Sequence, residues 1–158
     1  MKFFEAHEYQ PTVIAVYEKL KERLQSILPL AQVEHVGSSA VVGAISKGDL
    51  DIFVGVSKAQ FEQSIMKIQS LGFQIKKDTL QTAALRMLES EDYPVDVAIQ
   101  LVELGSEFES FLKFRDLLVS DPELLTQYNR LKKESEGLEP QAYREKKSKF
   151  IVKALRRS

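Results

Sequence analysis

The run Leu50–Val56 is the feature that most restricts what this chain can fold into. It is nearly all apolar and rich in β-branched residues, which is typical of a strand buried on both faces. Short apolar runs and longer helical patterns surround it along the chain. We therefore expect an α/β (α+β) fold, with a mixed sheet and helices packed on it.

The segments before and after this strand predict a helix, a strand and a second helix. Apolar residues recur at helical spacing over residues 12–28, and Pro11 just before them suits a first helical turn. Residues 31–36 are expected to form a short strand that ends at a Gly-Ser turn, followed by a short helix to about residue 45. A Ser-x-x-Gln pattern at residue 57 opens a helix that Gly72 closes.

The second half of the chain changes from strands to helices at about residue 105. Further strands are expected at residues 73–77, 83–88 and 95–101. Helices are expected at residues 108–119, 120–136 and 141–157. We expect one domain over residues 1–158, with an α/β core at 1–105 and C-terminal helices at 106–158.

The composition limits the chemistry that the chain can support. It has no cysteine and two histidines, so a metal ion would be held by oxygen ligands. No apolar stretch is long enough to span a bilayer, and the N-terminus turns acidic before any apolar run. The chain is therefore expected to be cytoplasmic, with no membrane partner.

Three acids are the candidates for catalysis and metal binding. Asp49 and Asp51 are two residues apart where a strand begins, so their side chains share one face. Asp96 lies inside the apolar segment 95–101, where an unpaired charge is costly. Together the three acids predict a site for Mg²⁺ or Mn²⁺, and Gly37 and Ser38 predict a turn whose backbone and hydroxyl contact phosphate.

These motifs resemble the nucleotidyltransferase superfamily built on the DNA polymerase β palm, and more narrowly the GrpB family within it. The resemblance covers nearly the whole chain. It rests on Glu34-His35-Val36-Gly37-Ser38-Ser39-Ala40-Val41 with Gly43, on Lys47, Asp51-Ile52 and Val95-Asp96-Val97, and then on Phe114-Arg115-Asp116, Leu131-Lys132, Tyr143, Lys147 and Phe150-Ile151.

The chain also departs from the family pattern. Val42 and Gly48 replace common prolines, Ser39 replaces a common threonine, and position 49 is more often apolar than acidic. The segment Ala98-Ile99-Gln100 lacks a histidine that is usual in the family. Asp49 brings this chain closer to the catalytic members of the superfamily than a typical relative.

The resemblance implies further residues for a triphosphate. Ser39 belongs to the phosphate turn, and Lys47, Arg115 and Lys147 occupy matching positions where cations would offset the phosphate charge. A solvated helix face is the competing interpretation for Arg115, and it is favoured for Lys132. His35 fits a pocket position and a structural hydrogen bond equally well.

The expected function is Mg²⁺-dependent transfer of a nucleoside monophosphate from an NTP to an unidentified acceptor. Asp49 and Asp51 would bridge the metal ions, while Asp96 would bind one ion or accept the acceptor's proton. Two alternatives stay open: a non-catalytic module that binds a nucleotide or another phosphorylated ligand, and a protein-interaction domain that uses the basic C-terminal helix. Residues 141–158 hold seven Lys/Arg and one Glu, yet a net charge of -1 makes nucleic acid the less favoured partner.

Overall fold

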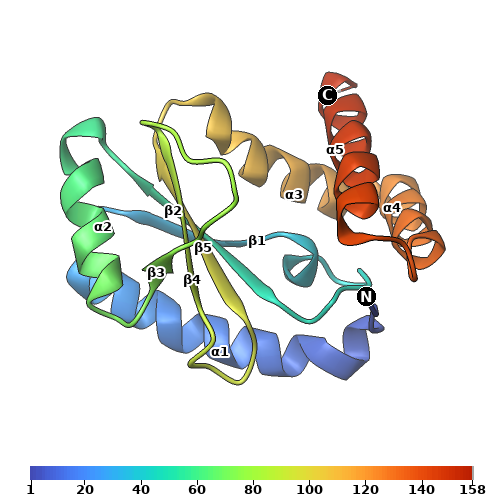
Figure 1. The fold of residues 1–158 in the computed structure, drawn as a ribbon, viewed down its shortest axis with the longest axis horizontal. Helices are drawn as coiled ribbons and strands as arrows, with labels where there is room; N and C mark the ends of the chain where they lie inside the picture. The colour runs from blue at the N-terminus through green and yellow to red at the C-terminus, as the bar shows by residue number, and fades with distance from the viewer. Residues whose placement is uncertain (158) are drawn as a thin grey trace.

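The computed structural model describes residues 1–157, and Ser158, the last residue of the expected helical segment, lies outside them. The described residues form a five-stranded mixed sheet in the order β1-β2-β5-β4-β3 (Figure 1). The strands are β1 Gln32–Val36, β2 Leu50–Val56, β3 Gln74–Ile75, β4 Leu85–Ser90 and β5 Val97–Glu103. The α-helices are α1 Ala6–Ile27, α2 Phe61–Gln69, α3 Ser110–Ser120, α4 Pro122–Glu134 and α5 Pro140–Arg156. The predicted mixed sheet with packed helices is confirmed.

Strands β2 and β5 are parallel, and every other neighbouring pair in the sheet is antiparallel. A parallel pair needs a long crossover, and α2, β3 and β4 lie between these two strands in the chain. The N-terminal ends of β2 and β5 therefore meet at one edge of the sheet, because Leu50 pairs with Val97.

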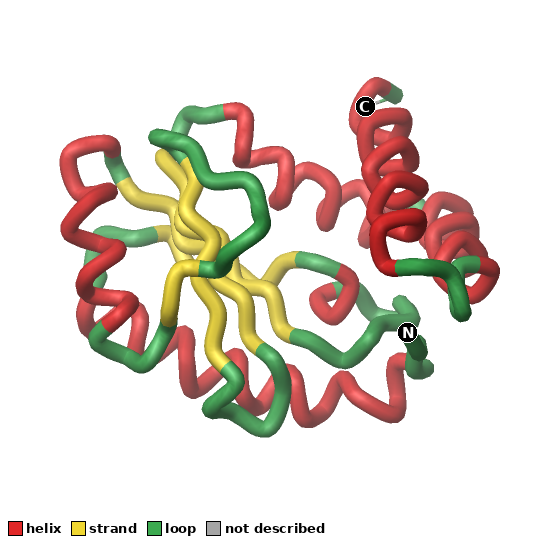
Figure 2. Tube along the Cα trace, in the orientation of Figure 1, coloured by secondary structure: helices red, strands yellow, loops and turns green. Residues whose placement is uncertain are grey.

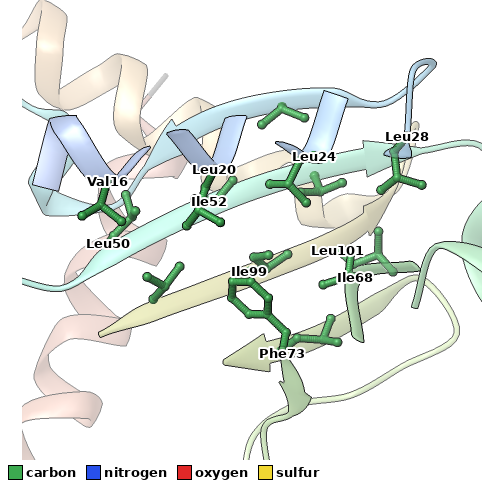
Figure 3. Close-up of a cluster of buried hydrophobic side chains, with 14 of the residues drawn as sticks. Val16, Leu20, Leu24, Leu28, Leu50, Ile52, Ile68, Phe73, Ile99 and Leu101 are labelled. Carbon is green, nitrogen blue, oxygen red and sulfur yellow. The ribbon is translucent and has the colours of Figure 1, made fainter. Parts of the chain in front are cut away.

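Helices α1 and α2 cover one face of the sheet. The α1 residues Leu20 and Leu24 are fully buried against Ile52 and Ile99, as Figure 3 shows. Leu50, Ile52, Val54 and Val56 all join this cluster, which follows from the two-residue period of a strand. The alternate residues, beginning with Asp51, therefore face the other side of the sheet.

Helix α3 and the C-terminal helices lie on that other side (Figure 2). Val36, Phe53, Leu85 and Val102 form a buried cluster with Phe108, Phe111 and Leu112 at the start of α3. A third cluster joins α3, α4 and α5 to the loop residues Val41 and Ala44. The C-terminal helices thus pack on the segment that connects β1 to β2.

Two predicted details were wrong. Helix α1 begins at Ala6 rather than near Thr12, so that Pro11 lies inside the helix. Glu5 caps the earlier start, with its N–H donating to the Glu8 carboxylate at 3.1 Å. The short helix expected up to residue 45 is the single 3-10 turn η1 Ser38–Ala40.

The remaining short elements fit their local sequences. Two more 3-10 turns, η2 Lys58–Gln60 and η3 Glu107–Glu109, precede α2 and α3. The Ser106 hydroxyl accepts from the N–H of Phe108, and the Asp121 carboxylate accepts from the N–H of Leu124 at 3.0 Å. Both side chains act as N-caps where the sequence pattern placed a helix start.

Candidate functional site

The strand register brings the acidic residues to one edge of the sheet. Asp51 is level with Ala98 on β5, so Asp49 is level with Asp96 just before that strand. The Leu50 N–H donates to the Asp96 carbonyl at 2.8 Å, which fixes this alignment. On the other side, Val36 of β1 pairs with Asp51, and the turn at Gly37 therefore begins beside the Asp51 side chain.

Gly37 has a φ of 73°, a left-handed conformation that favours glycine. A Cβ at this position would collide with Oδ2 of Asp51 and lie 3.2 Å from its Cγ. The turn backbone thus lies directly against the carboxylate. Glycine is required here by its backbone conformation and also by the close approach of Asp51.

A central cavity of about 370 Å³ lies between this face of the sheet and the C-terminal helices. Its polar lining comes from the Gly37-Ser38 turn, from Asp51 on β2 and Asp49 just before it, and from α4 and α5. Among the described residues, five basic side chains and two acidic ones line it: Lys47, Lys76, Lys132, Arg144 and Lys147 with Asp49 and Asp51. This excess of basic groups favours an anionic ligand.

The Asp51 carboxyl is perturbed by burial and by its charged neighbours. Burial and then the charge of the neighbouring Asp49 raise its pKa, which reaches about 6 although Lys147, a hydrogen bond from Gln100 and Lys47 act in the opposite direction. The Gln100 Nε2 donates to Asp51 Oδ1 at 3.3 Å. A cation beside these two adjacent carboxylates would be stabilising, because it offsets their mutual repulsion.

Lys132 of α4 is 1% exposed, although the sequence favoured a solvated position for it. Its Nζ donates to the Ser38 hydroxyl, donates to the Ile45 carbonyl at 2.7 Å, and lies 4.2 Å from the centre of the Tyr128 ring. Burial lowers its pKa well below the ordinary value, and Lys147 lowers it further. The helical spacing of Leu124, Tyr128 and Lys132, four residues apart, is the sequence signal that could have identified this buried stripe.

Lys147 of α5 also lines the central cavity. Its pKa is raised by the electrostatic influence of Tyr128, Tyr143, Asp51 and Asp49, against the lowering effect of burial. A charged ammonium group is therefore held close to the two carboxylates. Lys47, which is exposed, lines the cavity from the segment before β2.

The expected cluster of three acids is not gathered around this cavity. Asp96 is exposed and lines a separate edge cavity of about 360 Å³, together with Lys47, Gly48, Asp49 and residues 93–95. Within residues 1–157, no group of three His, Cys, Asp or Glu side chains is placed to hold a metal ion. Asp96 is level with Asp49 just before β5 and shares only the edge cavity with it, whereas the residue level with Asp51 in the central cavity is Ala98.

Two other residues expected near the ligand, Arg115 and Ser39, have structural partners instead, and so does His35, for which both roles were left open. The Arg115 guanidinium pairs with Glu34 and Asp116, both at 2.9 Å, and donates to the His35 carbonyl. The Ser39 hydroxyl lies 2.8 Å from His35 Nε2. Arg115 and His35 line a different depression on the outer side of β1.

His35 stacks on Tyr17 with ring centres 4.9 Å apart. Burial and then the charge of Arg115 lower its pKa to about 4. The ring is therefore neutral at physiological pH. Its contacts support the structural interpretation of this histidine over the pocket one.

The fold is that of the nucleotidyltransferases. The structure of the Cid1 poly(U) polymerase with MgGTP bound superposes with a TM-score of 0.54 at 18% identity, covering 80% of this chain and 42% of that one. The crystal structure of the conserved protein GrpB from Enterococcus faecalis superposes with a TM-score of 0.79 at 22% identity, covering 99% and 98% of the two chains.

The sequence comparisons define the family within this fold. The family model described as GrpB protein matches residues 4–157. The UPF0157 protein VC_A0354 of Vibrio cholerae is 45% identical over 155 residues, covering 98% of this chain and 82% of that protein. The UPF0157 protein BH1888 of Halalkalibacterium halodurans is 26% identical, covering 96% and 80%. The chain belongs to the GrpB family, as its motifs predicted.

One finding concerns the helices alone. Within residues 1–157, none of them combines the length and the apolar character that crossing a bilayer requires.

Proposed function

We propose that this chain binds an NTP in the central cavity and transfers its nucleoside monophosphate to an acceptor. The observation that carries the proposal is the arrangement around Ser38, where a glycine turn, two carboxylates and the buried Lys132 meet. The turn and the lysines provide the contacts that the phosphates of a nucleotide need. The fold shared with Cid1, whose structure holds MgGTP, supports the same ligand class.

The role that we propose for each residue follows from its position in the cavity. Lys132 and Lys147 would bind the β and γ phosphates and hold the departing pyrophosphate, with Ser38 orienting them by its hydroxyl. When bound between Asp49 and Asp51, Mg²⁺ or Mn²⁺ would supply a positive charge at the phosphate undergoing transfer. Carboxylate oxygens are the donors that these ions prefer. The raised pKa of Asp51 supports a cation at this position, because the cation would stabilise the ionised carboxylate.

The edge cavity is where we place the acceptor. It shares Lys47 and Asp49 with the central cavity and contains Asp96. An acceptor hydroxyl entering there would form a bond to the α phosphorus as the bond to pyrophosphate breaks. Its proton would pass to the exposed carboxylate of Asp96, which is the role that this acid retains outside the central cavity.

A second candidate is a binding module that holds the nucleotide without transferring it. It is favoured by one observation: Ala98 stands level with Asp51, where a third carboxylate would complete the central site. The two candidates differ in pyrophosphate release. Incubation with Mg²⁺ and each NTP, with water as the acceptor, should release pyrophosphate from the enzyme, whereas a binding module leaves the NTP intact.

The nucleotide site itself is tested by thermal stability. Each NTP with Mg²⁺ should raise the melting temperature, because a ligand that binds only the folded state stabilises it. Lys132→Met should weaken NTP binding at least tenfold. The matched control is Lys133→Met, the next residue of α4, which is exposed and pairs with Glu5 and should leave NTP binding unchanged.

The result that contradicts the proposal is equally clear. If no NTP shifts the melting temperature of the unsubstituted protein with either Mg²⁺ or Mn²⁺, the cavity is not a nucleotide site. If the Lys132 and Lys133 variants lose affinity equally, the effect comes from general charge and not from the buried contact with Ser38.

A further inference from the structure

Gln100 of β5 is a buried polar residue in the lining of the central cavity. It is 5% exposed and is level with Phe53 on β2 and Met87 on β4. Its amide nitrogen donates to Asp51. Within residues 1–157, its Oε1 is buried and has no hydrogen-bond partner.

An unpaired buried carbonyl is costly, because it loses its hydrogen bonds to water without gaining another. The orientation of the Gln100 amide explains why its oxygen is left unpaired in the free protein. A carboxylate can only accept hydrogen bonds, so Gln100 turns its NH₂ group toward Asp51 and leaves the oxygen without a donor. The two ends of an amide have nearly the same shape, so the reverse orientation occupies the same space.

A cation on the acid pair would reverse this preference. It would repel the NH₂ group and attract the amide oxygen, which is a suitable ligand for Mg²⁺ and Mn²⁺. Two neighbouring positions offer less: Ala98 has no donor atom, and Asp96 lies in the edge cavity. We propose that Gln100 supplies the third oxygen ligand of the divalent cation that Asp49 and Asp51 bind, by turning its amide over when the ion arrives.

This inference rests on the proposed function, because it requires a cation at Asp49 and Asp51. Its specific content is the role of the amide oxygen. The alternative is that Gln100 only positions Asp51 through its NH₂ group. The two roles make opposite predictions for a substitution that keeps the oxygen and removes the donor.

The experiment is a titration of the full chain with Mn²⁺ alone at pH 8, with free Mn²⁺ measured by electron paramagnetic resonance. Gln100→Glu should bind Mn²⁺ at least tenfold more tightly than the unsubstituted protein, because a carboxylate replaces a neutral oxygen ligand. Gln100→Met should bind it at least tenfold more weakly. The matched control is Asp92→Asn, at an exposed position outside both cavities, which should change the affinity less than threefold.

Each other outcome overturns a defined claim. Weaker Mn²⁺ binding by the Gln100→Glu variant would show that Gln100 only positions Asp51, and the nucleotide site would stand. A large loss of affinity in an Asp96→Asn variant measured alongside would make Asp96 the third ligand. Absence of Mn²⁺ binding by the unsubstituted protein would overturn both this inference and the metal in the proposed function.

A second measurement applies even if the Gln100→Glu variant fails to fold. The side-chain NH₂ resonances of Gln100 in the ¹⁵N-labelled protein should move when saturating Mg²⁺ is added, because the hydrogen bond to Asp51 is lost. Resonances that stay in place while Mg²⁺ binds would overturn the inference.

Discussion

Asp51 is a partly buried carboxylate that shares a strand face with a second acid, Asp49. Its pKa rises from 3.8 to about 6 in the folded chain, chiefly through burial. A raised pKa means that the folded state holds the proton more tightly than the unfolded state. The contribution of Asp51 to stability is therefore most favourable below pH 4 and is lost as the pH rises through 6.

We predict that Asp51→Asn removes this pH-dependent loss. Between pH 4 and pH 7, its melting temperature should rise relative to that of the unsubstituted protein, by an amount that corresponds to about 3 kcal/mol in the free energy of unfolding. The stabilisation that Mg²⁺ with NTP gives the unsubstituted protein should be absent from the variant. Scanning fluorimetry across this pH range checks both effects. Asp92→Asn, at an exposed position, is the control and should follow the unsubstituted curve. A variant that melts lower than the unsubstituted protein at pH 7 would make Asp51 a structural acid.

Single residues were predictable from the sequence where local spacing determines their positions. The two-residue period placed Asp49 and Asp51 together, and both line the central cavity. Arg115 was not predictable in this way, because its partner Glu34 is far away in the sequence. The role of Gln100 depends on the register between β2 and β5, which the sequence alone does not specify.

The turn between β1 and η1 is the element that ties the phosphate site to the acids. Gly37→Ala should lower both the melting temperature and the NTP affinity, because its Cβ meets the Asp51 carboxylate. Gly105→Ala is the matched control: Gly105 also has a positive φ, of 89°, but no atom lies within 4 Å of its ideal Cβ among the described residues. Thermal melts and NTP titrations are measured for both variants. Gly105→Ala reports the effect of backbone strain alone, and Gly37→Ala reports strain together with displacement of Asp51. Equal effects on NTP affinity would refute the close contact as the cause.

Elements differ in how clearly the sequence marks their ends. Strand β2 was predicted at its observed bounds, since its apolar run ends sharply on both sides. Helix α1 was not, because an apolar stripe shows where a helix is buried and not where it begins. Strand β3 is only two residues long, which is too short for a periodic pattern to define.

For the molecule as a whole, the basic side chains fall into two groups. Lys132 and Lys147 line the central cavity, whereas Lys149 and Lys153 are exposed on the outer face of α5. The sequence showed the excess of basic residues but not this separation, because it depends on how α4 and α5 pack against residues 41–45.

We predict that the double variant Lys149→Glu and Lys153→Glu leaves the NTP-dependent melting shift unchanged at physiological ionic strength, since charges beyond about 8 Å are screened there. The measurement is the same thermal titration. Loss of the shift would indicate that the outer face of α5 takes part in ligand binding, and would favour the interaction-domain alternative.

Helix α4 holds the loop before β2 by four polar contacts. Asn129 accepts from the Ile45 N–H and donates to the Gly43 carbonyl, while Lys132 donates to Ile45 and Ser38. These partners are more than 80 residues apart in the sequence. During synthesis, the turn and the acids emerge from the ribosome long before the helix that completes them. The site is thus assembled only after α4 has been synthesised, so that chains that have not yet reached this helix have no complete cavity in which to capture a ligand.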